Sequence, residues 1–487
     1  MSGGSVNAGF SGMGIAPQMS QLSSVVLGTK SLYQPKGHQA LAPSHRNESN
    51  FLSPVNGVVN PPYTAGLKIV YSLPKTSTLI GKMWSEIQLA AAQTNPAYTP
   101  AVAADTLADP QVAAAAAVGT PQAEYVKNVG DLVFEQILLR YGSTVIQQYD
   151  SEFQVFQRQL TRNNINIEHI NVEVLGNLPP GGNTEQTLVD ALYNGVTLRH
   201  PLEHLWCTQN QDHHWMPESL ALEGQLEFTL RPLGELIVTA TGDNTVFTGG
   251  AAVLPAITDL RLRYQEITLS AAEKEHRLRF YKSPEGMVNL FQDIEAQPGF
   301  RIQGTAAGGN LNVNVPLANF RLDMAEVMFV CRIAEDTGAV ALPGYVYKAD
   351  LRDWRGSRAE ANVTTASLLG GGGGHLGVHH PIVDYKMTAG GKDLQNAIPE
   401  LWSRTHVRKQ YHADAQTGGA VYMISFSVYP EDTKNATGHA SASVLGALAL
   451  NLTLPNPGAT KVVQVDVWAK GYNITQARAG GLSKALH

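Results

Sequence analysis

The segment VYMISFSV at residues 421–428 is followed by the polar turn YPED at 429–432. Its larger side chains recur at every second position, which predicts a strand with one face in a core. On that face we expect Tyr422, Ile424, Phe426 and Val428. Residues 444–454 alternate again, and VVQVDVWAKGYNI at 462–474 predicts a third strand before a glycine-rich tail. Three strands separated by turns, with no helix between them, predict an antiparallel all-β sandwich or barrel, which favours a binding or building protein over an enzyme.

The same pattern covers two stretches of similar size. Strand-like segments of the first stretch lie at 66–73, 79–91, 131–140, 143–149, 220–230 and 233–240. Those of the second lie at 260–269, 311–315 and 325–333, followed by the closing strands. Each stretch includes a short helix. Asp150 or Ser151 is expected to begin one, with Gln154 as capping-box partner, and the S-x-x-E sequence at 270–273 begins a basic one.

Changes in composition divide the chain into five parts. Residues 1–60, rich in Gly, Ser, Asn, Pro and Gln, predict an extended N-terminal arm without a core of its own. Residues 61–241 form the first β domain, 242–257 a linker, 258–475 the second β domain, and 476–487 a C-terminal tail. The long segments at 92–123 and 334–384 are either surface loops or contact loops in an assembly.

The composition limits the classes of function. Hydrophobic residues make up 43% of the 487 residues, enough for a substantial core. Charged residues make up only 16%, against about 25% in a typical soluble domain. Either much of the surface is buried against other subunits, or Gly, Ala, Asn and Thr in loops replace charges. With a net charge of −6 and no long basic stretch, we expect no direct binding of nucleic acid. Two cysteines and no signal peptide favour folding in a reducing compartment.

One segment combines residue types that bind zinc. It is LRHPLEHLWCTQNQDHHWMPE at 198–218, with His200, His204, Cys207, His213 and His214. The proline and the irregular pattern disfavour a helix that would place the first two histidines on one face. We therefore expect these histidines to lie in a solvated or inter-subunit loop.

Other candidate sites are weaker. The five glycines at 370–374 precede His375, His379 and His380, but without the lysine and helix start that a phosphate loop needs. The carboxylate pairs Glu273/Glu275 and Glu431/Asp432 fall at a helix start and in a turn. We expect no catalytic, cofactor-binding or metal-binding residues, and no cofactor.

Several blocks, taken in order, resemble the double jelly-roll major capsid proteins of the nucleocytoplasmic large DNA virus lineage, which includes iridoviruses and chlorella viruses. The resemblance covers residues 65–482. Its blocks are the strand at 79–91 with Trp84, then KNVGDLVFEQILLRYGSTVIQQYDSEF, LALEGQLEFTLRPLGELIV, ITLSAAEKEHRLRF, NVNVPLANFRLDMAEVMFVCR, IPELWSRTHVRKQYH, VYMISFSVYPED and VDVWAKGYNITQARAGGL.

The resemblance implies two consecutive eight-stranded antiparallel jelly rolls with short helices and long loops. It also implies a structural protein, not an enzyme, whose homotrimers form pseudo-hexagonal capsomers in the icosahedral shell of a double-stranded DNA virus. The implied partners are the chain itself, neighbouring capsomers, penton and minor capsid proteins, and an inner viral membrane. The implied location is the virion, after synthesis in the host cytoplasm. Two alternatives are a minor or virophage-type capsid protein of this fold, and a β-sandwich that binds carbohydrate or metal.

Overall fold

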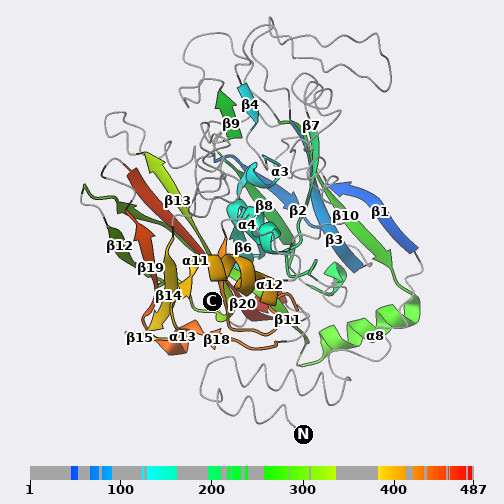
Figure 1. Ribbon diagram of the computed structural model, residues 1–487. Coiled ribbons are helices and arrows are strands. Elements are labelled where there is room, and N and C mark those ends of the chain that lie inside the picture. The colour runs from blue at the N-terminus through cyan, green and yellow to red at the C-terminus, as the bar shows by residue number, and fades with distance from the viewer. Residues whose placement is uncertain are drawn as a thin grey trace, which may run out of the picture.

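The computed structural model describes residues 45–52, 66–75, 79–89, 123–125, 129–161, 196–209, 216–220, 222–231, 236–239, 257–284, 286–306, 309–335, 382–412, 421–432, 436–456, 459, 461–478 and 481–484. Within these ranges the chain is mostly antiparallel β-sheet, arranged as two lobes side by side (Figure 1). None of the described helices is long and apolar enough to cross a bilayer.

The first lobe consists of two four-stranded sheets. One has the order β1 (His45–Leu52), β10 (Ile257–Thr268), β3 (Leu79–Leu89) and β7 (Val196–Pro201). The other has the order β2 (Lys68–Ser72), β8 (Gly224–Leu230), β5 (Phe134–Tyr141) and β6 (Thr144–Asp150). A short pair, β4 (Ala123–Tyr125) and β9 (Ile237–Thr239), lies apart from them. Two facing sheets whose inner side chains alternate form a β-sandwich.

The second lobe repeats this arrangement. One sheet has the order β11 (Met287–Gln303), β20 (Lys461–Arg478), β13 (Asp323–Glu335) and β17 (Tyr422–Ser425), with β18 (Ala440–Ser441) and β21 (Gly481–Lys484) added. The other has the order β12 (Asn310–Pro316), β19 (Leu448–Pro455), β14 (Asp384–Ala389) and β15 (Lys392–Asp393), with β16 (Ile398–Pro399) added. These two lobes constitute a double jelly roll.

Helices connect and cover the sheets. Between the lobes lies α4 (Ser151–Thr161), and α8 (Ala271–Lys282) lies at the outer edge (Figure 1). The continuous helical segment α11 (Glu400–Trp402), η8 (Ser403–Val407) and α12 (Arg408–Tyr411) contains a π-helical turn. Shorter turns are α3 (Val129–Leu132), η6 (Pro217–Ser219) and α13 (Ala442–Leu445).

Two large hydrophobic cores hold this arrangement. One fills the second lobe between its sheets, where Phe329 and Val465 meet Tyr385 and Leu450. The other fills the first lobe and continues through Phe156 of α4 to the outer face of the second lobe's larger sheet. Because one core continues across the junction, the lobes are joined by packed side chains and not only by a linker.

Most predicted strands are confirmed, and the alternation decides which side chains are buried. In β19 the even-numbered leucines from Leu448 to Leu454 are all buried. The prediction fails at Val428, which is 60% exposed because β17 ends at Ser425. There the Ser425 hydroxyl donates to the Ser427 carbonyl over 2.7 Å and turns the chain. The segment 444–447 is also not a strand, since α13 occupies its first positions.

Both predicted helices begin at the expected positions, but one of the predicted capping contacts is not made. Asp150 caps α4, because the Phe153 N–H donates to its carboxylate at 2.7 Å. Gln154 does not complete a capping box, since its side-chain amide donates to the Tyr149 hydroxyl at 3.3 Å. At α8 the Glu273 N–H donates to the Ser270 hydroxyl at 3.3 Å, as the S-x-x-E pattern predicts.

The strand pairing differs from the predicted domain division at two places. The division assigned residue 258 onward to the second domain, but β10 pairs with β3 and β1 and so lies in the first lobe. Residues 45–52, assigned to the arm, form strand β1 at the edge of that sheet. The remaining boundaries stay predictions. The loops at 92–122 and 336–381 lie outside the described residues, as does the arm before residue 45.

Candidate functional site

Trp468 of β20 connects the second lobe to α4 of the first. Its indole Nε1 donates to Asp150 Oδ2 at 2.9 Å, and its ring packs against Phe156 with centroids 5.3 Å apart. The same carboxylate caps α4 through its other oxygen. One aspartate therefore fixes both the start of the helix and the position of the neighbouring lobe.

The carboxyl group of Asp150 makes stability depend on pH. Burial, and next the charge of Glu152, raise its pKa to about 6, against an opposing effect of the Trp468 hydrogen bond. A raised pKa in the folded state means that stability is complete below the unfolded pKa near 3.8 and is lost as pH rises through about 6. The wild type should lose up to about 3 kcal/mol of unfolding free energy over this pH range, and Asp150→Asn should not lose it. Denaturant unfolding at pH 4 and pH 7 measures it. Asp393→Asn, at an exposed ion pair, is the control, and an equal pH slope in Asp150→Asn and wild type would contradict the assignment.

Three glutamine side chains beside the junction pair with backbone groups, and the Gln209–Gln292 pair joins the two lobes. Gln209 Nε2 donates to the Gln292 carbonyl at 2.6 Å, and its Oε1 accepts the Gln292 N–H at 2.9 Å. Gln292 Nε2 in turn donates to the Pro430 carbonyl at 2.7 Å. Gln147 makes a similar double contact with the His204 carbonyl and the Trp206 N–H. These amides satisfy backbone groups that would otherwise be buried without partners.

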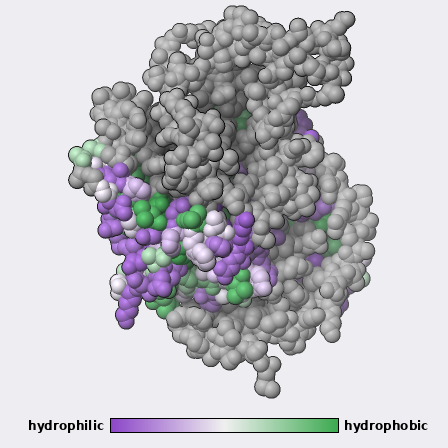
Figure 2. Space-filling view, in the orientation of Figure 1, coloured by the Kyte–Doolittle hydropathy of each residue, from purple (hydrophilic) through white to green (hydrophobic). Residues whose placement is uncertain are grey.

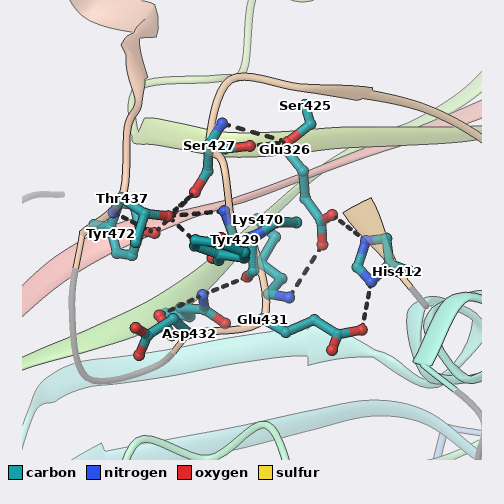
Figure 3. A network of polar contacts seen from close by, with 12 residues as sticks. Glu326, His412, Ser425, Ser427, Tyr429, Glu431, Asp432, Thr437, Lys470 and Tyr472 are labelled. Atoms are coloured by element: carbon teal, nitrogen blue, oxygen red, sulfur yellow. Dashed lines mark hydrogen bonds and ion pairs between the residues drawn. The ribbon is translucent and has the colours of Figure 1, made fainter. Parts of the chain in front are cut away.

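A buried charged network lies beside these amides (Figure 3). Glu326 of β13 accepts from Lys470 Nζ at 3.0 Å and from His412 Nε2 at 2.8 Å. The other ring nitrogen of His412 contacts the carboxylate of Glu431 at 2.5 Å. Glu326 and His412 are completely buried, whereas the Glu431 side chain is 47% exposed. The network links the sheet of the second lobe, the end of α12 and the loop that follows β17.

The charges of this network stabilise one another. Burial alone would raise the pKa of Glu326, but Lys470 and His412 lower it to about 2. Burial alone would lower the pKa of His412, but Glu326 and Glu431 raise it to about 9. Both groups are therefore charged at neutral pH, and each depends on the other.

A cavity of about 220 Å³ lies between the lobes next to this network. Both lobes contribute residues to its lining, and most of these residues are polar: Gln157, Glu203, His204, Gln209, Gln292, Ile294, Glu431 and Lys470. Burial, and then the charges of Lys470 and Arg158, lower the pKa of His204 to about 3, so this imidazole is neutral.

Two histidines of the predicted zinc segment are described, His200 in strand β7 and His204 partly buried in the turns that follow it. His200 is in β7, fully buried, with Nδ1 2.9 Å from the carboxylate of Asp131. His204 packs edge-on against Phe153, with centroids 4.9 Å apart. The expectation of solvated or inter-subunit histidines is therefore wrong for His200, because Asp131, which also pairs with Arg158, provides a buried polar partner.

The structure does not bring a metal-ligand set together within its described residues: no three His, Cys, Asp or Glu side chains there are arranged to hold an ion. Cys207 is buried. His213, His214 and the segment with His375, His379 and His380 lie outside the described residues.

The predicted carboxylate pairs have structural partners. Glu273 and Glu275 each pair with an arginine one turn later on α8, at 3.2 Å to Arg277 and 2.7 Å to Arg279. Glu431 contacts His412 as described. The sequence analysis missed Glu326, His412 and Lys470. A charged residue inside the apolar run AEVMFVCRI was the available signal, because a buried carboxylate requires a partner.

The second lobe also exposes apolar side chains. On the face shown in Figure 2, hydrophobic residues form small clusters among hydrophilic ones. Trp402 is 54% exposed and stacks on His406 with centroids 4.0 Å apart. Val428 and Tyr429 are exposed on the loop next to the charged network.

Comparison with known proteins identifies the fold class. No protein-family model matches the sequence, and no curated protein does. Solved structures do match, and they are double jelly-roll proteins of viral capsids. The resemblance predicted from the sequence blocks is thus confirmed at the level of the fold.

Three of these structures show the extent of the likeness. The VP54 protein of PBCV-1, a crystal structure fitted into a reconstruction of the virophage Sputnik, is 15% identical with a TM-score of 0.61, over 91% of this chain and 97% of that one. The Faustovirus major capsid protein is 12% identical with a TM-score of 0.62, over 89% and 90%. The Sputnik virophage structure is 8% identical with a TM-score of 0.50, over 91% and 88%.

Proposed function

We propose that this chain is the major capsid protein of an icosahedral double-stranded DNA virus, and that it assembles as a homotrimer. The observation that carries the proposal is the double jelly roll, matched over about nine-tenths of the chain by capsid proteins. Three subunits with two similar lobes each present six lobes around a three-fold axis, which gives a pseudo-hexagonal capsomer.

The junction between the lobes supports this role. A shell subunit transmits load between neighbours, so its lobes must keep a fixed relative position. The continuous core, the Trp468–Asp150 bond and the Gln209–Gln292 pair provide such a junction. Exposed apolar side chains such as Trp402 and Tyr429 offer surface that contacts between subunits would cover.

The proposal extends to partners and location. Capsomers would contact one another, penton and minor capsid proteins, and an inner membrane reached by the arm at residues 1–44. The protein would be made in the host cytoplasm and incorporated into the virion. A minor or virophage-type capsid protein has the same fold, and the copy number in purified particles distinguishes the two roles.

The molecular mass of the purified full-length chain in solution tests the proposal. We expect light scattering to give three times the chain mass of 52.4 kDa, and electron microscopy to show particles with a hexagonal outline. A monomer that stays monomeric at high concentration and binds stoichiometric zinc would support the β-sandwich binding protein instead. Variants Trp402→Asp and Tyr429→Asp, compared with Glu275→Gln on the exposed face of α8, show whether the apolar sites contribute to the trimer.

A further inference from the structure

We propose that Lys484 and Asn473 form an intramolecular isopeptide bond, with Asp293 as the group that transfers the proton. These three residues come from three adjacent strands. Asp293 is in β11, Asn473 in β20 and Lys484 in β21. The bond would form within one chain, whether or not the chain assembles.

A single oxygen brings the two reacting groups together. Asp293 Oδ2 accepts from Lys484 Nζ at 2.9 Å and from Asn473 Nδ2 at 3.0 Å. The amine and the amide are thereby held next to each other by one carboxylate. Such fixed proximity of a nucleophile and its target is what makes a slow acyl transfer fast enough to observe.

The site is shielded from water. Asn473 is fully buried, Asp293 is 2% exposed, and the Lys484 side chain is 16% exposed. Phe291, which pairs directly with Asn473 across the strands, is also fully buried. The lysine ammonium can pass a proton to the Asp293 carboxylate that it contacts, and this transfer removes both charges. Lysine then presents a neutral amine, the form that attacks a carbonyl.

The amide is positioned for attack at its carbon. The Ile474 N–H donates to Asn473 Oδ1 at 2.8 Å, which stabilises negative charge on that oxygen as a tetrahedral intermediate forms. The amide nitrogen, the leaving atom, is the one that contacts Asp293. The same carboxyl group can therefore receive a proton from lysine and deliver it to the leaving nitrogen.

The reaction balances without a cofactor. The bond between Lys484 Nζ and Asn473 Cγ forms, and the bond between Cγ and Nδ2 breaks. A lysine ammonium and an asparagine amide become one secondary amide and one ammonium ion, and Asp293 ends as the carboxylate it began as. Nothing is oxidised or reduced.

The bond would fasten β21 to the sheet. This strand pairs with β20 through residues 475–478 and lies against β6 of the first lobe. A covalent link from β21 to β20 would keep this edge strand in place at the junction of the lobes, where four residues of pairing alone are easily opened.

Intact mass spectrometry of the purified full-length chain tests the proposal. We expect a mass below the calculated one by one ammonia, and a branched peptide containing both residues after proteolysis. Lys484→Arg keeps a cation for Asp293 but cannot form the amide, so its mass should equal the calculated value. Asp293→Asn should also stay unlinked. Lys470 serves as a matched control within the same chain. It also pairs with a buried carboxylate, that of Glu326, but the other partner there is His412 and not an amide, so the peptide containing Lys470 should be recovered unlinked.

Two results would overturn the proposal. One is a wild-type mass equal to the calculated value, with the peptides of Lys484 and Asn473 recovered separately. The other is the same loss of ammonia in Lys484→Arg, which would place the lost ammonia elsewhere. The mass of the wild-type chain does not depend on whether the variants fold. The first result is therefore decisive even where a variant folds poorly.

Discussion

Glu326→Gln is expected to lower the free energy of unfolding by about 3–5 kcal/mol, because it leaves buried cations without their counter-charge. The glutamine has nearly the same shape, so packing is preserved. What changes is that Lys470 and His412 lose the carboxylate that both contact within 3.0 Å. The midpoint of denaturant unfolding at constant slope measures this loss.

Two further variants make this result specific. Glu275→Gln removes a carboxylate from a pair in which both side chains are more than half exposed, so we expect little change in the free energy of unfolding. The double change Glu326→Leu and Lys470→Met should recover much of the stability, since apolar residues of similar volume often replace a buried ion pair without loss. A loss in Glu326→Gln no larger than in Glu275→Gln would refute the role given to the network.

The stability that this network contributes also depends on pH. His412 has a raised pKa, so its contribution is complete below 6.5 and is lost as pH rises through about 9. Glu326 has a lowered pKa, so its contribution is complete above 4.5 and is lost as pH falls through about 2. Stability from this network is therefore greatest between pH 4.5 and 6.5. In Glu326→Gln, the free energy of unfolding should change less with pH both above and below this range.

The fold could be predicted because period-2 alternation is a local property of the sequence. β19 shows this clearly, since its leucines alternate and the buried residues follow them. Val428 shows the limit: it continues the alternation, but the side chain of Ser425 turns the backbone before it. β10 shows another limit, because its pairing with β3 joins residues far apart in sequence, and no local pattern states which sheet a strand enters.

The candidate site was less predictable for the same reason. Its main contacts join distant segments, as in Trp468 with Asp150 or His412 with Glu326. His200 was assigned to a loop because of the proline and the irregular pattern around it. Its partner Asp131 lies in another element, and only the fold brings the two within 2.9 Å. Composition and spacing can identify a histidine, but its environment depends on tertiary contacts.

Trp468→Ala is expected to cost about 3–5 kcal/mol, the range for removing a buried aromatic side chain. The indole is 3% exposed and fills the core shared by both lobes, so its loss leaves a cavity at the junction. It also removes the donor to the buried carboxylate of Asp150. Denaturant unfolding followed by two probes, one in each lobe, measures the loss.

Trp402 provides a matched control, since the same substitution there removes a tryptophan that is 54% exposed. We expect Trp402→Ala to cost less than about 1 kcal/mol in the isolated subunit. Trp468→Phe keeps contact with Phe156 but removes the indole N–H, so it should cost about 1–2 kcal/mol and isolate the hydrogen bond. If the junction couples the lobes, Trp468→Ala also separates the transitions seen by the two probes. Coincident transitions with a loss no greater than that of Trp402→Ala would mean that the lobes are joined by other contacts.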